Sequence, residues 1–172
     1  TASSALAAAS AELAVTDVDL AKRDDARRLG AVWIHPDAAD EVECDVFAPC
    51  ALGGAVNERS VERLRCEIVC GSANNILDSK ASAERLAERG IIYAPDFIAN
   101  AGGLISVYGE LRELPAAGME RLVDGIGEAI GRVLGDARRE GITPLAAAER
   151  AAATRLSRAA RSTERVAVAR AG

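Results

Sequence analysis

The chain has few aromatic residues: one Trp, two Tyr and two Phe among 172 residues. Proteins that bind single-stranded nucleic acids stack bases on aromatic side chains, so the sequence predicts no nucleic-acid partner. It also lacks an apolar run of the 18 or so residues that a membrane helix needs, which predicts no membrane partner. Its 49% hydrophobic and 27% charged residues are typical of an ordinary globular domain.

Cysteine and histidine are scarce, and they lack the spacing of a zinc site. Four cysteines and one histidine are present, with no pair of C-x2-C knuckles. Each cysteine lies in or beside an apolar run, so we expect four small buried hydrophobes and no metal site: Cys44, Cys50, Cys66 and Cys70. The first residues lack a signal-peptide pattern, which predicts a cytoplasmic protein.

Charge is distributed unevenly around the net value of -5. Residues 1–149 carry 15 basic and 25 acidic side chains, whereas residues 150–172 carry six arginines and one acidic residue, Glu164. Such a tail can bind nucleic acid or a membrane surface. A solvated last helix with a frayed end is the simpler interpretation.

Short apolar runs alternate with polar stretches that suit helices. The runs are typical of strands covered on both faces, and they lie at residues 13–15, 31–34, 46–48, 68–70 and 91–94. The helix-compatible stretches are residues 20–29, 57–64 and 78–88. This alternation predicts an α/β fold with a parallel sheet flanked by helices. Gly30 and Gly90 each follow a helical stretch, where positive φ ends a helix easily.

The last third of the chain is predicted to be helical. Apolar residues at helical spacing predict an amphipathic helix over residues 117–139. Gly127, Gly131 and Gly135 recur every four residues in it, and each lowers helix stability unless a neighbour packs closely. Thr143 at an N-cap and Pro144 in the first turn then begin another helix.

Ligands of open parallel sheets bind beyond the carboxyl ends of the strands, and Asp17 follows the first predicted strand. Its carboxylate could accept hydrogen bonds from both hydroxyls of an adenosine ribose. It would also repel a 2′-phosphate, which favours NAD over NADP. An Asp after a strand is equally common as a helix N-cap, so both interpretations stand.

Three further segments follow predicted strands. Residues 48–54 form a small-residue loop, which suits either a close backbone approach to a ligand or a tight turn. Asn74 and Asn75 could orient a nicotinamide or ribose, or cap the helix near Asp78. In residues 93–103, Asn100 and two glycines precede a helix. These residue types lower helix stability, which indicates that a ligand or neighbouring segment there needs a side-chain amide or a close approach to the backbone.

These segments resemble the NAD-dependent leucine, valine and phenylalanine dehydrogenases, relatives of glutamate dehydrogenase. The resemblance rests on Asp17 and on the strings A-P-C-A-L-G-G at 48–54, G-S-A-N-N at 71–75 and Y-A-P-D-F-I-A-N-A-G-G at 93–103. It implies an incomplete Rossmann-type parallel sheet flanked by helices, with an all-helical C-terminal segment. It also implies NAD as cofactor and oxidative deamination of an L-amino acid to its 2-oxo acid and ammonia, in a complete enzyme that is a homo-oligomer.

The same resemblance assigns roles to individual residues. It implies that Asp17 binds the adenosine ribose and that the dinucleotide is lined by Cys50, Ala51 and Leu52. Ala73 and Asn74 would contact the nicotinamide ribose, and Asn100 would lie beside the nicotinamide and the substrate. Substrate side chains would meet Leu104 and Val107, which share a helical face with Asn100. Both are aliphatic, as in the branched-chain members.

Parts of the family pattern are not found. The substrate domain with its catalytic lysine and aspartate is missing, and Lys22 and Lys80 lie outside that context, so we assign no catalytic residue. Residues 1–10 look like the second half of a helix that follows the first strand and its glycine-rich loop. We therefore expect a partial NAD-binding domain at 1–112, helices and a basic tail at 113–172, and no activity of this chain alone. The alternative is a non-catalytic nucleotide-sensing or subunit-binding module.

Overall fold

The computed structural model describes residues 11–171, with side chains placed up to Arg161. The predicted end of a helix at residues 1–10 lies outside the described residues. The chain forms two compact units, Thr1–Cys44 with Arg63–Arg65 and Asp45–Glu62 with Cys66–Gly172. The domain boundary expected at residue 112 stays a prediction.

The described residues of the first unit form a small parallel sheet and two helical segments. β1 (Ala14–Val15) pairs with β2 (Val32–Trp33) in parallel, with Val15 opposite Trp33. Between them lies α2 (Lys22–Arg28), and Gly30 follows it at a φ of +73°. The strand, helix and helix-ending glycine predicted here are confirmed. A 3-10 helix at Pro36–Glu41, which the apolar pattern did not indicate, follows β2.

The second sheet has the order β3-β4-β5, formed by β3 (Glu43–Phe47), β4 (Arg65–Val69) and β5 (Ile92–Tyr93). β4 and β5 are parallel. Two helices lie between these strands in sequence, α3 (Ser60–Arg63) and α4 (Lys80–Glu88). The core contains fully buried aliphatic side chains, among them Val56, Val69, Ile76 and Leu86. This arrangement confirms the α/β class with short parallel sheets flanked by helices.

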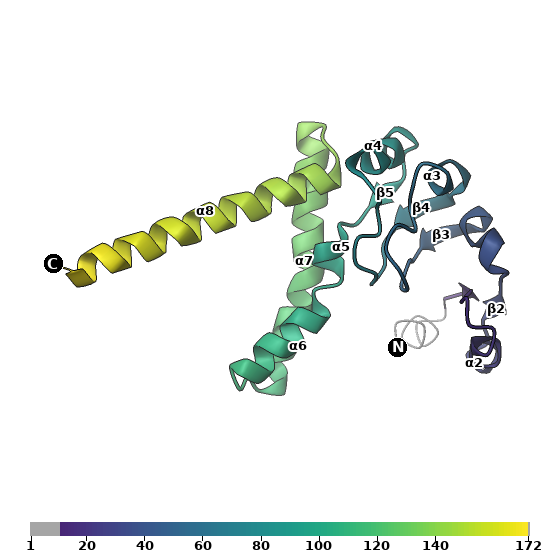
Figure 1. The fold of residues 1–172 in the computed structure, drawn as a ribbon, viewed down its shortest axis with the longest axis horizontal. Helices are drawn as coiled ribbons and strands as arrows, with labels where there is room; N and C mark the ends of the chain where they lie inside the picture. The colour runs from purple at the N-terminus through teal and green to yellow at the C-terminus, as the bar shows by residue number, and fades with distance from the viewer. Residues whose placement is uncertain (1–10, 172) are drawn as a thin grey trace. The chain divides into compact units, whose positions relative to one another are not determined.

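The remaining segment is helical, as predicted. It comprises α5 (Asp96–Ala99), α6 (Gly102–Leu111), α7 (Ala116–Glu140) and α8 (Pro144–Ala171) (Figure 1). The hydroxyl of Thr143 accepts a hydrogen bond from the Ala146 N–H, so the predicted N-cap is confirmed. α7 and α8 pack around buried residues that are small or β-branched: Val133, Ala137, Ala147 and Ala148.

The three glycines that recur every four residues in α7 have no close neighbour on their open side among the described residues. A methyl group added at Gly127, Gly131 or Gly135 would meet no described atom within 4 Å. Close packing that offsets their cost is therefore absent among the described residues. No helix in the described part of the chain is long and apolar enough to cross a membrane.

Candidate functional site

The loops after β3 and β4 are joined by backbone hydrogen bonds. The Ala73 N–H donates to the Pro49 carbonyl at 3.0 Å, and the Gly54 N–H donates to the Asn75 carbonyl at 2.8 Å. Two glycines allow this approach. A Cβ at Gly71 would overlap the backbone of Pro49, and one at Gly53 would lie 2.8 Å from the Asn74 carbonyl oxygen. The segments 48–54 and 71–75 are therefore held close together after the ends of β3 and β4.

Asp96, the first residue of α5, joins the loop after β4 to the segment after β5. One carboxylate oxygen accepts the Ile76 N–H at 2.8 Å, and the other accepts the Phe97 N–H at 2.6 Å. Asp96 is 9% exposed and Ile76 is fully buried. All three segments that the sequence singled out after β3, β4 and β5 thus lie together in the second unit.

Tyr93, at the end of β5, supports the same junction. Its hydroxyl oxygen accepts a hydrogen bond from the Asp96 N–H at 3.2 Å, and the side chain is 2% exposed. Burial raises the pKa of Tyr93 to about 12, and the negative charge of Asp96 acts in the same direction. The phenol therefore stays neutral over the physiological range.

We expect Tyr93 to titrate near pH 12 rather than near the ordinary tyrosine value of about 10. In a Tyr108→Phe variant the tyrosinate absorbance reports Tyr93 alone, because the chain has two tyrosines. The folded state holds this proton more tightly than the unfolded state. Stability is therefore full below about pH 10 and falls as the pH rises towards 12. Titration near pH 10 with an unchanged circular dichroism spectrum would contradict the burial of Tyr93.

The side chains of Asn74 and Asn100 are hydrogen-bonded to each other. The Asn100 Nδ2 donates to the Ala73 carbonyl at 3.3 Å and to the Asn74 Oδ1 at 2.7 Å. A carbonyl oxygen can only accept, so Ala73 fixes which end of the Asn100 amide faces it, and Asn100 then fixes Asn74. The atoms that this pair leaves for a ligand are one acceptor, the Asn100 Oδ1, and one donor, the Asn74 Nδ2.

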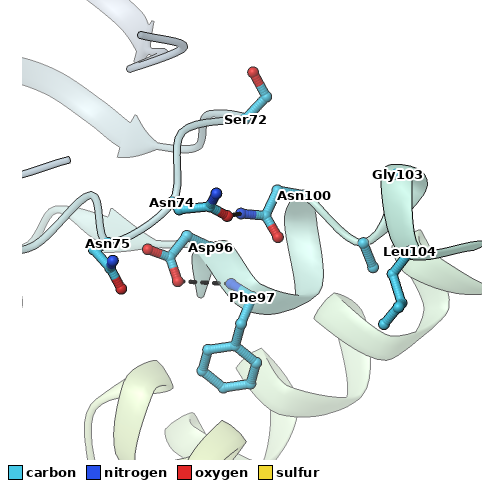
Figure 2. Close-up of a pocket in the computed structure, with 9 residues that line it drawn as sticks. Ser72, Asn74, Asn75, Asp96, Phe97, Asn100, Gly103 and Leu104 are labelled. Carbon is cyan, nitrogen blue, oxygen red and sulfur yellow. Dashed lines mark hydrogen bonds between the residues drawn. The ribbon is translucent and has the colours of Figure 1, made fainter. Parts of the chain in front are cut away.

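A pocket of about 590 Å³ adjoins this pair. Figure 2 shows Asn74 and Asn100 facing each other, with Leu104 on the neighbouring helix. The lining residues come from the loop after β4, from α5 and from the start of α6, and they are Ser72, Asn74, Asn75, Asp96, Phe97, Asn100, Ala101, Gly103 and Leu104. Predicted residues Asn74, Asn100 and Leu104 are therefore brought together here.

Leu104 and Val107 lie on α6 and are 74% and 54% exposed. Neither side chain is buried in the core of the described residues, and their proposed contact with the substrate stays a prediction. The expectation that they share one helix face with Asn100 is wrong, because α5 ends at Ala99 and α6 begins at Gly102. Asn100 occupies the break between these helices. Val107 is not among the residues that line the pocket.

Asp17 lies two residues beyond β1, in the first unit. Its Oδ1 accepts the Asp19 N–H at 2.9 Å, and the Asp19 Oδ1 accepts the Ala21 N–H at 3.0 Å. Asp19 is thus the acidic residue that supports the start of α2, and the N-cap interpretation of Asp17 is not supported. Asn74 and Asn75 likewise do not cap α4, because Ser79 does so by accepting the Ser82 N–H.

The cysteines are less buried than expected. Cys50 is exposed and the other three are half-buried, so the expectation of burial is wrong for Cys50. It directly precedes a bend at residues 51–53, where Ala51 and Leu52 are also exposed. Burial raises the pKa of the Cys70 thiol. Within the described residues, no three His, Cys, Asp or Glu side chains are placed to hold a metal ion.

Sequence reasoning assigned no role to Asp96, Ser72 or Phe97. The available signal for Asp96 was its position directly after Pro95, where an acidic side chain begins a helix. That signal predicts the bond to Phe97 but not the one to Ile76, which lies 20 residues away in sequence. Ser72 and Phe97 carry no comparable signal.

Residues 7–163 match the family model described as glutamate/leucine/phenylalanine/valine dehydrogenase. Leucine dehydrogenase of Thermoactinomyces intermedius is 44% identical over 147 residues, which are 85% of this chain and 40% of that protein. Valine dehydrogenase of Streptomyces albus is 39% identical over 158 residues, or 90% and 43% of the two chains. The crystal structure of L-tryptophan dehydrogenase from Nostoc punctiforme superposes with a TM-score of 0.86 at 34% identity, covering 91% of this chain and 48% of that one. The chain thus spans about two fifths of the length of these curated relatives.

Proposed function

The chain belongs to the glutamate/leucine/phenylalanine/valine dehydrogenase family, and we propose that it forms the NAD-binding part of an amino-acid dehydrogenase. The proposed substrate is a branched-chain or other apolar L-amino acid, and the proposed product is its 2-oxo acid. Relatives named leucine and valine dehydrogenases support this substrate class. The exposed aliphatic side chain of Leu104, which lines the pocket, supports it as well.

The proposed reaction is an oxidation followed by hydrolysis. The Cα–H bond of the amino acid breaks as a hydride leaves, the amine becomes an imine, and water converts the imine to the 2-oxo acid and ammonia. NAD, when bound, supplies the hydride acceptor. The residues of this chain bind and orient, because none of them is assigned to the proton transfers that the reaction also needs.

The Asn74–Asn100 pair is the observation that carries the proposal. It offers one hydrogen-bond acceptor and one donor beside a pocket of about 590 Å³. A primary carboxamide needs the complementary set, since its NH2 donates and its carbonyl accepts. Nicotinamide carries such a group, so the polar atoms of this pair fit the cofactor. A pair of carboxylates or lysines here would not fit.

The loop after β3 supplies the second part of the proposed cofactor site. Cys50, Ala51 and Leu52 are exposed, and they follow the strand end that hydrogen bonds tie to the loop after β4. Small and apolar side chains let a dinucleotide approach the backbone closely. Ala73 would contribute in the same way, with its carbonyl already used to hold Asn100.

Titration of the 172-residue chain with NADH, followed by NADH fluorescence, tests the proposal. We expect saturable binding that NAD displaces. Asn100→Ala should weaken it by about tenfold or more, because the variant removes the proposed acceptor for the nicotinamide NH2 and leaves Asn74 without its hydrogen-bond partner. Ser157→Ala, an exposed change on α8, is the control and should bind as the unaltered chain does. Absence of saturable binding would contradict the proposed function. If the complete protein binds NADH but oxidises no amino acid, the alternative function, a non-catalytic nucleotide-sensing module, would be favoured.

In the complete enzyme, Asp17→Ala should reduce the preference for NAD over NADP by about tenfold or more. The change removes both a charged acceptor for the ribose hydroxyls and the repulsion of a 2′-phosphate. The ratio of kcat/KM for the two cofactors is the measurement. Asp19→Ala removes the same charge two residues away, from the side chain that bonds Ala21, and should leave the ratio unaltered. An unchanged ratio in Asp17→Ala would count against the assignment.

A further inference from the structure

We propose that Asp96 is a positioning residue, whose buried carboxylate holds the Asn74–Asn100 pair in its ligand-binding arrangement. The identity of the ligand rests on the proposed function, whereas the positioning itself rests on the contacts of Asp96. The proposed reaction assigns Asp96 no chemical step, because both of its carboxylate oxygens accept hydrogen bonds from backbone N–H groups.

The carboxylate is the chemical group that this place requires. The N–H groups of Ile76 and Phe97 point at it from two different segments, and each needs an acceptor, since a buried donor without one is costly. A carboxylate provides two acceptor oxygens. A side-chain amide of the same shape provides one oxygen and one NH2, so one of the two N–H groups would face another donor.

Asp96 also contacts both ends of the pair through the backbone. Its carbonyl oxygen accepts the Asn100 N–H at 2.7 Å, which fixes the position of Asn100, whose Oδ1 is the acceptor for a ligand. Its carboxylate accepts the Ile76 N–H, which fixes the position of the loop that carries Asn74, whose Nδ2 is the donor. A single residue therefore fixes the distance between two side chains that lie 26 positions apart in sequence.

The position of Asp96 explains how it affects the geometry of the pocket. Asp96 lines the pocket together with Asn74 and Asn100, but its oxygens are directed to protein N–H groups rather than offered to a ligand. If one of the two carboxylate oxygens of Asp96 is replaced by an NH2 group, the hydrogen bond to Ile76 or Phe97 is lost, and the loop after β4 should separate from α5. The Asn100 amide would then lose its fixed partners, Ala73 and Asn74, without any change to its own side chain.

The first measurement needs no ligand. In the 172-residue chain, nuclear magnetic resonance should show that Asp96→Asn reduces the protection of the Asn100 side-chain amide from hydrogen exchange by about tenfold or more. Backbone protection at Val133 and Ala137, in the core between α7 and α8, should stay unchanged. Asp78→Asn is the matched control: it removes the same charge from a carboxylate that accepts the Ser82 hydroxyl, outside the pocket. Unaltered protection of the Asn100 amide in Asp96→Asn would overturn the proposal.

The second measurement is a double-mutant cycle on NADH affinity. Asp96→Asn should weaken binding by about tenfold in the unaltered chain and by less than about threefold in an Asn100→Ala background, because the residue acts through the pair. Equal losses in both backgrounds would mean general destabilisation and would overturn the proposal. If the unaltered chain binds no NADH, the proposed function fails, and the exchange measurement still decides whether Asp96 positions the pair.

Discussion

Gly71→Ala is expected to lower the free energy of unfolding by about 3 kcal/mol or more. Gly71 follows β4 directly, and a Cβ there would overlap the carbonyl oxygen and the backbone carbon and nitrogen of Pro49. These are backbone atoms in a hydrogen-bonded junction, since the Ala73 N–H donates to the same Pro49 oxygen at 3.0 Å. They cannot rotate away as the end of a flexible side chain can. The loops after β3 and β4 would have to separate.

Urea denaturation followed by circular dichroism measures this loss, and Gly131→Ala provides the control. It adds the same methyl group in the interior of α7, where nothing described lies within 4 Å. Alanine is the better helix former, so this variant should gain about 0.5–1 kcal/mol. A Gly71→Ala variant as stable as the unaltered chain would show that the two loops are not packed as closely as the structure has them.

The elements of the fold could be predicted because their signals are local. The helix expected at 117–139 is observed at Ala116–Glu140, and Gly90 has the expected positive φ, at +74°. Strand limits were less predictable, because backbone pairing rather than apolarity sets them. β3 begins at Glu43 and β4 at Arg65, each several residues before its apolar run. The exposure of Cys50 was missed because an apolar neighbourhood in sequence does not fix the depth of a loop.

The candidate site shows a sharper limit. The sequence indicated Asn74 and Asn100 separately, since each follows a predicted strand. Their mutual hydrogen bond joins residues 26 positions apart, and no local pattern encodes it. Asp96 is the extreme case: its local bond to Phe97 is foreseeable, whereas the bond to Ile76 depends on how two loops meet. Residue types thus indicated the candidate side chains, and tertiary packing determined which of them are hydrogen-bonded to each other.

Leu104→Ala should shift substrate preference in the complete enzyme from leucine towards phenylalanine. Leu104 lines the pocket beside Asn100, so a shorter side chain lengthens the space for the substrate's apolar end. Removing a methylene or more from such a wall changes kcat/KM ratios by about 10–200-fold. Because Leu104 is 74% exposed, its truncation removes little buried surface, and the fold should keep its stability.

The leucine-to-phenylalanine ratio of kcat/KM is the measurement, with the melting temperature recorded for each variant. Leu111→Ala is the matched control, because Leu111 lies on the same helix, is 78% exposed and does not line the pocket. It should alter neither the ratio nor the melting temperature. A constant ratio in Leu104→Ala would remove this residue from the substrate site. A lowered melting temperature with that constant ratio would assign Leu104 to packing against a part of the enzyme beyond these residues.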